Sequence, residues 1–165
     1  MRSLIQSIRC LNMATWGKCN ECDLCPMSST NFSPNAVRHH LQEVRSAFLS
    51  LHKALLDSER MLYEQFYGRI PSSGEFFRLV IGHEWFSWLR PMSQFVAQVD
   101  ETLSTKEPVT LEQANELLEV ARKLIRITEN GTEQEQRYYY AIQRDPNVAM
   151  MHVGVAQLLA AKPQQ

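Results

Sequence analysis

The sequence has few glycines and prolines, no long hydrophobic run and no excess of positive charge. Its 165 residues include only six Gly and seven Pro, too few for a β-sandwich, which needs frequent turns. No apolar run approaches the roughly 20 residues that a membrane-spanning helix needs. Lys and Arg number 17 against 18 Asp and Glu, a net charge of -1. This balance argues against a nucleic-acid-binding protein, and we expect neither a nucleic-acid nor a membrane partner.

Cysteine is absent after residue 25. All four cysteines, Cys10, Cys19, Cys22 and Cys25, lie near the N-terminus, so no disulfide can form within residues 26–165. This distribution favours a reducing compartment, and we expect a cytoplasmic protein. The first ten residues also lack the long hydrophobic stretch of a secretory signal.

Common enzyme motifs are missing as well. The sequence contains no G-x-S-x-G, no P-loop and no G-x-G-x-x-G. No Glu is followed three residues later by His, so the pairs that hold the metals of di-iron helical bundles are absent. The sequence therefore favours a protein that is not an enzyme, without deciding the question.

Residues 1–33 differ in composition from the rest of the chain. They contain every cysteine and end in the polar run 28–33. We expect this segment to be a leader: either a disordered tail or an over-extended reading frame whose true start is Met27. A helical domain is expected over residues 34–161, and residues 162–165 should fray.

From Pro34 onward the sequence is strongly helix-periodic. Apolar residues recur in steps of three, four and finally seven, at Val37, Leu41, Val44, Phe48, Leu51, Leu55 and Leu62. This is a heptad pattern, with Ser33-Pro34 as a start signal and Gly68 as an end signal. It predicts one helix of roughly 33 residues, about 50 Å long. Such a length suggests the spine of an antiparallel bundle or a dimer seam.

Capping signals divide the remainder into further helices. Ser72 with Glu75, Thr110 with Gln113, and Thr132 with Glu135 form three capping boxes, and Asp145-Pro146 starts a last helix. Pro91 should kink the middle segment or mark a new start. We therefore predict an all-α bundle of five to six helices, with one long N-terminal helix and a Pro-kinked middle helix.

The cysteine cluster is the most specific chemical feature. Cys10, Cys19, Cys22 and Cys25 are separated by eight, two and two residues, and two overlapping C-x-x-C units could present thiolates to zinc or to an iron–sulfur cluster. The pattern departs from a bacterial ferredoxin site, because Pro26 follows the third closely spaced cysteine and no cysteine lies downstream. The alternative is a thiol-bearing leader that binds no metal.

The aromatic residues supply candidate interface positions. Residues 85–91 contain two of the three tryptophans, and residues 138–140 are three consecutive tyrosines. Core packing is expected for one ring of each pair. Because the aromatic side chains occupy more than one helix face, some should reach a surface, where Trp and Arg often dominate binding. The interface candidates are Trp85, Trp88, Arg90, Tyr138 and Tyr139.

Two further features have ordinary and functional interpretations. His83 lies beside the aromatic block, either as a pocket residue or as a loop histidine near a helix cap. Residues 100–119 hold six acids and one Lys, a net of -5. This stretch is either a solvated surface or a docking site for a basic partner.

Three segments resemble a known group of proteins. Residues 51–56 (LHKALL), residues 85–93 (WFSWLRPMS) and residues 138–152 are similar to a family of small bacterial all-helical proteins. The resemblance spans about residues 36–160. It implies a cytoplasmic bacterial protein whose domain begins after the cysteine cluster, and it implies no activity.

Together these features predict a non-enzymatic helical interaction or regulatory module, which associates with itself as a homodimer or with a protein partner. The alternative is a metal-binding or redox-sensing protein that uses the four cysteines. A third possibility is a small-ligand or haem-binding bundle with His83 near its pocket.

Overall fold

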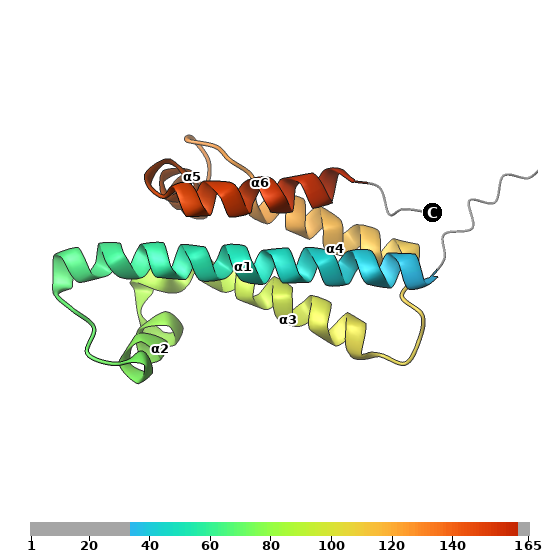
Figure 1. Ribbon diagram of the computed structural model, residues 1–165, viewed down its shortest axis with the longest axis horizontal. Helices are drawn as coiled ribbons and strands as arrows, with labels where there is room; N and C mark the ends of the chain where they lie inside the picture. Colours follow the sequence, from blue (N-terminus) through green and yellow to red (C-terminus); the bar gives the residue numbers. More distant parts are fainter. Residues whose placement is uncertain (1–33, 162–165) are drawn as a thin grey trace, which may run out of the picture. The chain divides into compact units, whose positions relative to one another are not determined.

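A computed structural model describes residues 34–161 of the chain (Figure 1). Within them the chain forms six α-helices and one short 3-10 helix, and no strand. In chain order these are α1 (Pro34–Tyr67), α2 (Ser73–Gly82), η1 (Glu84–Leu89), α3 (Arg90–Ser104), α4 (Leu111–Leu124), α5 (Glu133–Arg144) and α6 (Pro146–Ala160). The predicted all-α fold is confirmed.

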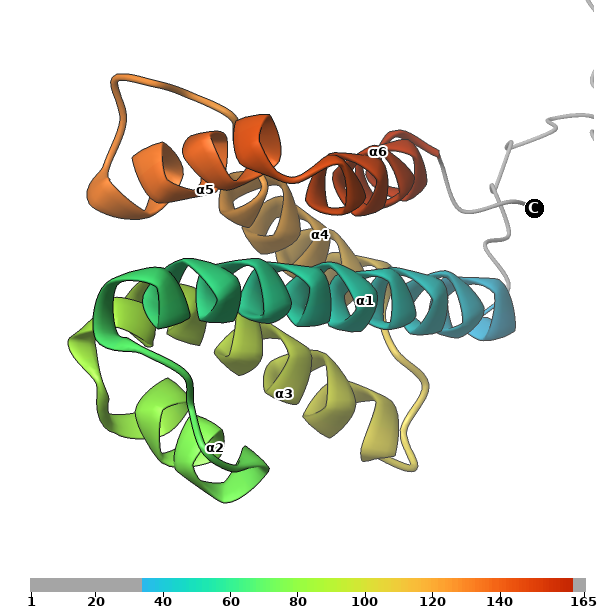
Figure 2. The same cartoon turned by 60° about the vertical axis from the view of Figure 1, so that its left-hand side comes forward.

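Helix α1 is the spine of the domain. It packs against α6 and α3, with α2 and α3 on one side of it and α4, α5 and α6 on the other (Figures 1 and 2). Its predicted apolar positions are buried, except that Leu62 is half-buried. The heptad face is therefore used inside this domain, because it meets the domain's own helices. The helix ends at Tyr67. The next residue is Gly68, whose φ of 87° suits glycine and whose N–H donates to the Glu64 carbonyl at 3.0 Å.

The predicted caps stabilise the shorter helices. Thr110 and Gln113 form a reciprocal capping box at α4, and Thr132 and Glu135 form another at α5. At α6 the Asp145 carboxylate accepts the Asn147 N–H at 2.9 Å, with proline at the first helical position. Each cap satisfies backbone donors that a helix leaves unpaired at its start, and contributes about 1 kcal/mol.

The middle of the chain differs from the predicted kinked helix. Helix α2 ends at Gly82, His83 follows in an extended conformation, and η1 leads directly into α3. Pro91 lies in the first turn of α3. Proline costs little there, because the first N–H groups of a helix have no intrahelical partner. Of the two outcomes expected for Pro91, the structure has the new start and not the kink.

The core lies between α1 and the helices on both sides of it. Phe48 of α1 meets Phe95 of α3 with ring centroids 4.6 Å apart. A bidentate ion pair between Arg45 and Asp100 also joins these helices, with one N–O distance of 3.0 Å.

Within residues 34–161, no helix combines the length and the apolar character needed to cross a bilayer.

Candidate protein-interaction surface

Helix α2 is apolar around more than half of its circumference, yet none of its ten residues is buried. At about 100° per residue, the apolar side chains span an arc of about 200°: Phe76, Phe77, Leu79, Val80 and Ile81. Packing on η1 covers one edge of this arc, where Phe76 meets Phe86 at 5.7 Å. At the other edge Phe77 and Ile81 are 65% and 57% exposed. We call these two residues, one helical turn apart, the α2 ridge.

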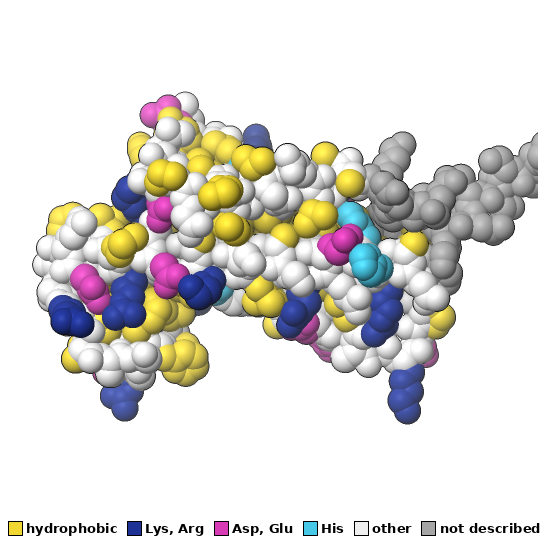
Figure 3. Space-filling model, viewed as in Figure 1, with side chains coloured by type: hydrophobic (Ala, Val, Ile, Leu, Met, Phe, Trp, Pro, Cys, Tyr) yellow, Lys and Arg dark blue, Asp and Glu magenta, His cyan; other side chains and the backbone are white. Residues whose placement is uncertain are grey.

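Figure 3 shows apolar side chains exposed on the lobe formed by α2, at the lower left. An amphipathic surface helix normally keeps its apolar side chains against the core. The α2 ridge is therefore an apolar surface without a partner among the described residues.

Trp85 lies among aromatic residues of the C-terminal end of α1. Its ring is 5.8 Å from Tyr63, 6.0 Å from Phe66 and 5.9 Å from Tyr67. The His83 Nδ1 accepts the Trp85 N–H at 3.1 Å, so His83 caps η1. This agrees with the interpretation of His83 as a histidine near a helix cap.

Arg137 of α5 contacts both the ring and the backbone carbonyl of Trp85. Its guanidinium carbon lies 5.7 Å from the centroid of the Trp85 ring, and its Nη1 donates to the Trp85 carbonyl at 2.8 Å. Glu133 pairs with the same guanidinium at 3.3 Å. The cation–π contact thus packs the guanidinium against the Trp85 ring, which is half-buried.

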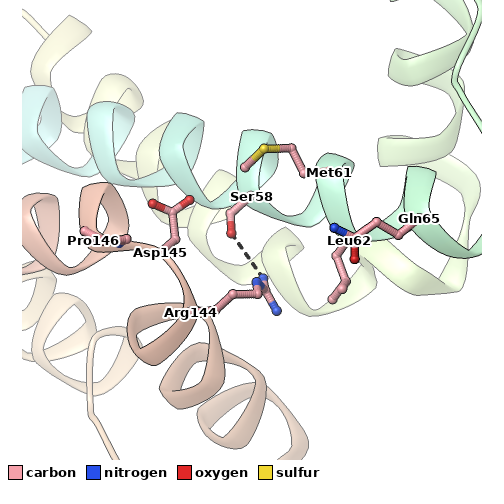
Figure 4. Close-up of a pocket in the computed structure, with 7 residues that line it drawn as sticks. All are labelled: Ser58, Met61, Leu62, Gln65, Arg144, Asp145 and Pro146. Carbon is pink, nitrogen blue, oxygen red and sulfur yellow. Dashed lines mark hydrogen bonds between the residues drawn. The ribbon is translucent and has the colours of Figure 1, made fainter.

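Two hollows adjoin beside α1. The first, of about 290 Å³, lies where α1 faces the junction of α5 and α6 (Figure 4), and it is lined by Ser58, Met61, Leu62, Gln65, Arg144, Asp145 and Pro146. The second, of about 250 Å³, is lined by Glu59, Leu62, Trp85, Arg137, Tyr140 and Arg144.

Leu62 and Arg144 line both hollows, so the two adjoin and make up one surface. We call it the α1–α5 groove. Met61 and Tyr140 on its rim are each more than half exposed. Trp, Tyr, Arg and Met are the residue types enriched in protein interfaces, and the groove concentrates all four.

A buried ion pair forms the floor of the groove. The Arg144 Nη2 donates to a Glu59 carboxylate oxygen at 2.8 Å and to the Ser58 hydroxyl at 3.1 Å. The Glu59 side chain is only 5% exposed, and that of Arg144 is 35% exposed. A buried carboxylate requires such a partner, because water cannot solvate it. The pair thus joins α1 to α5 and fixes the shape of the groove.

The structure separates the interface candidates from the sequence into two groups. Trp88 and Tyr138 are buried, and the Tyr138 hydroxyl is hydrogen-bonded to His152 Nδ1 at 2.8 Å, so both rings belong to the core. Trp85 and Tyr139 are half-buried, and Arg90 is exposed. Of the five candidates, only Trp85 lines the α1–α5 groove. Arg90 lies beside the α2 ridge, because its Nη2 donates to the Ile81 carbonyl at 2.8 Å.

Sequence reasoning missed the main parts of this surface. Phe77 and Ile81 carried a detectable signal, since their four-residue spacing places them together on one edge of a wide apolar arc. Leu62, Arg137 and Arg144 carried none, because the groove is assembled from α1 and α5, which are far apart in the sequence.

The histidines of the described part of the chain act in packing and hydrogen bonding. His52 Nε2 lies 3.0 Å from the Ser93 hydroxyl, joining α1 to α3. Burial lowers the pKa of His52, of His152 and of His40 below the ordinary value of 6.5. His39 is 3.6 Å from Glu43, as expected for neighbours one turn apart.

No group of three or more His, Cys, Asp or Glu side chains within residues 34–161 could hold a metal ion. The predicted ligands Cys10, Cys19, Cys22 and Cys25 lie outside the described residues. The zinc or iron–sulfur prediction therefore stays a prediction.

The acidic stretch 100–119 is partly paired. Arg45 lowers the pKa of the Asp100 carboxyl by hydrogen bonding to it, and Arg122 pairs with Glu119 at 2.7 Å. Glu101 and Glu107 help to line a polar hollow of about 340 Å³ between α3 and α4. This surface has fewer unpaired charges than its sequence suggests.

No family model, curated protein or solved structure matches this chain.

Proposed function

We propose that the domain is a non-enzymatic helical protein-interaction module that associates with itself. The α2 ridge is the single observation that carries the proposal. A helix whose apolar side chains span more than half of its circumference is normally covered along that whole arc, and here the bundle covers only one edge of it. Exposed Phe and Ile side chains gain free energy on burial, roughly 1.5–3 kcal/mol for each side chain that becomes fully covered.

The surroundings of the ridge support the same function. Arg90 lies directly beside Ile81, and Arg78 projects from the same helix. An apolar centre with an arginine rim is the usual anatomy of a protein interface. The absence of cysteine after Cys25 supports a reducing compartment, so we propose that this module acts in the cytoplasm.

Light scattering coupled to size-exclusion chromatography tests the proposal. The chain mass is 19.1 kDa, and we expect the wild type to show a larger mass that rises with protein concentration. In the double variant Phe77→Glu/Ile81→Lys we expect the monomer mass. The introduced Glu and Lys are four residues apart with Glu first, an arrangement that supports a helix, so the ridge is removed without destabilising α2.

Val120→Glu is the matched control, because it also replaces an exposed apolar residue, on α4. This variant should associate like the wild type. A wild-type protein that stays monomeric at every concentration would refute the proposal.

The alternative function, metal binding or redox sensing by the four N-terminal cysteines, rests on their spacing alone. Elemental analysis of the full-length protein, purified without oxygen, decides it. About one zinc per chain, or stoichiometric iron, would support a metal site, and replacing Cys22 by Ser should then remove the metal. A metal-free protein would leave the interaction function as the single proposal.

A further inference from the structure

The turn between α4 and α5 contains the single Asn-Gly pair of the sequence, Asn130-Gly131. Asparagine is one of the thermolabile residue types, because the backbone nitrogen of the next residue can attack its side-chain amide. We propose that Asn130 is a deamidation site, at which the chain converts this residue to aspartate and isoaspartate without an enzyme. This modification is independent of the self-association proposed above. The triplet ending in Thr132 also fits the N-glycosylation pattern, but that pattern is used in secreted proteins and not in the reducing compartment proposed above.

The turn leaves the reacting groups of Asn130 and Gly131 accessible. Residues 126–132 form most of the loop between the two helices, which projects from the bundle in Figure 2. Asn130 is exposed in this loop. Within residues 34–161, the Gly131 N–H donates to no backbone carbonyl, so its nitrogen is not restrained as it would be inside a helix. Both the amide that is attacked and the nitrogen that attacks it are therefore available.

The packing of the loop requires glycine after Asn130. A Cβ atom on Gly131 would lie 2.5 Å from the Thr128 Cγ2 and 2.9 Å from the Glu135 Cβ, closer than side chains pack. The capping box of α5, to which Glu135 belongs, thus excludes a larger residue at position 131. A side chain at that position would hinder the attack, because it would lie beside the attacking nitrogen. The contacts that keep residue 131 a glycine therefore also keep Asn130 reactive.

The reaction balances with water as its co-reactant. The Gly131 nitrogen forms a bond to the Asn130 Cγ, the bond between Cγ and Nδ2 breaks, and the amide nitrogen leaves as ammonia with the proton from Gly131. The product is a succinimide ring. Water then opens the ring at one of its two carbonyl carbons. Attack at Cγ gives aspartate, and attack at the backbone carbonyl gives isoaspartate, in which the main chain runs through the former side chain.

Isoaspartate should disturb the start of α5. It lengthens the main chain by one carbon just before Gly131, which is closely surrounded. The Gly131 carbonyl accepts the Gln136 Nε2–H at 3.0 Å, and the Glu135 carboxylate accepts the Thr132 N–H at 2.8 Å. Displacement of residue 131 strains both contacts, so the first turn of α5 should open more often. Aspartate leaves the main chain unchanged, and its charge near a helix N-terminus is favourable.

Mass spectrometry of the full-length protein, incubated for several days at physiological temperature and mildly alkaline pH, tests the proposal. After digestion, we expect two acidic products of equal mass in place of the peptide that contains Asn130, with more isoaspartate than aspartate. Asn115 is the internal control, because it is also exposed but lies within α4. Helical hydrogen bonding restrains the nitrogen that follows it, so the peptide that contains Asn115 should keep its amide.

The variant Asn130→Gln links the chemistry to α5. Glutamine keeps an amide but must close a larger ring, so this variant should not convert during the incubation. The incubated wild type should lose hydrogen-exchange protection in the first turn of α5, and incubated Asn130→Gln should keep it. Equal losses in both proteins would show that the change in α5 does not come from this site.

Three results would overturn the site itself. If residue 130 keeps its amide in the folded protein while the same chain loses it in urea, the folded turn protects Asn130. If it keeps its amide in both, the pair is not reactive. If Asn130 and Asn115 convert at the same rate in the folded protein, the turn confers no reactivity of its own.

Discussion

Replacing Arg144 by Met should destabilise the domain by about 2–3 kcal/mol. The change leaves the Glu59 carboxylate, 5% exposed, without its charged partner. Breaking a fully buried ion pair costs about 3–5 kcal/mol. Arg144 is 35% exposed, so water can replace part of its contribution, and the expected cost lies below that range.

The assay is chemical denaturation followed by circular dichroism, with urea as denaturant. It should be done in the Phe77→Glu/Ile81→Lys background, because association would add to the apparent stability. Lys53→Met is the control: Lys53 pairs with Asp57 at 2.9 Å, but both side chains are exposed, and we expect a change of about 0.5 kcal/mol or less.

A double-mutant cycle completes the test. Adding Glu59→Gln to Arg144→Met removes the unpaired charge, so the double variant should be more stable than Arg144→Met alone. If Arg144→Met costs no more than Lys53→Met, or if the two changes are simply additive, the buried pair does not support the floor of the groove as described.

Three further predictions concern the core and the turns. Burial lowers the pKa values of His40, His52 and His152 below 6.5, so the folded state binds fewer protons than the unfolded chain. The contribution of these histidines to the free energy of unfolding should be at its maximum above pH 6.5 and should fall as the pH drops below 6.5. Equal unfolding midpoints at about pH 8 and pH 5.5 would contradict this. Tyr138→Phe removes the buried hydrogen bond to His152 and should cost about 1 kcal/mol in urea titration, with no change in association. Gly68→Ala meets no atom within 4 Å but must adopt a φ of 87°, so it should lower the free energy of unfolding by about 1 kcal/mol through backbone strain; an unchanged thermal midpoint would show that the turn relaxes.

Local sequence signals predicted most of the fold. The heptad steps of α1, the capping boxes at Thr110 and Thr132, and the Asp145-Pro146 start all depend on residues within one or two turns of each other. Such contacts are set by backbone geometry and side-chain spacing, which a sequence displays directly.

The conformation of η1 could not be predicted in this way. The sequence predicted a Pro-kinked helix through this part of the chain, whereas the chain forms a 3-10 helix over Glu84–Leu89. In a 3-10 helix side chains three residues apart eclipse each other, and accordingly Phe86 and Leu89 are both buried in the core. Tertiary packing against α1 and α5 decides this, and neither contact is local.

The candidate surface was predicted least well, for the same physical reason. Glu59 and Arg144 are 85 residues apart in the chain, and no local pattern marks them as partners. Trp85 was identified by its residue type, but its neighbour Trp88 has the same type and lies in the core. Composition indicates that an interface residue is present, and only the packing decides which ring remains accessible.

Helix α2 has one more consequence for the behaviour of the chain. Since none of its residues is buried, its amide hydrogens are protected by little more than the helix itself, and they should exchange with solvent by local opening. Those in the centre of α1 should exchange only when the whole domain unfolds. Phe76, Leu79 and Val80 pack against the core, but Phe77 and Ile81 do not, so substitutions at the α2 ridge should leave the rest of the bundle stable. The surface proposed to meet a partner can therefore change its sequence without endangering the bundle that carries it.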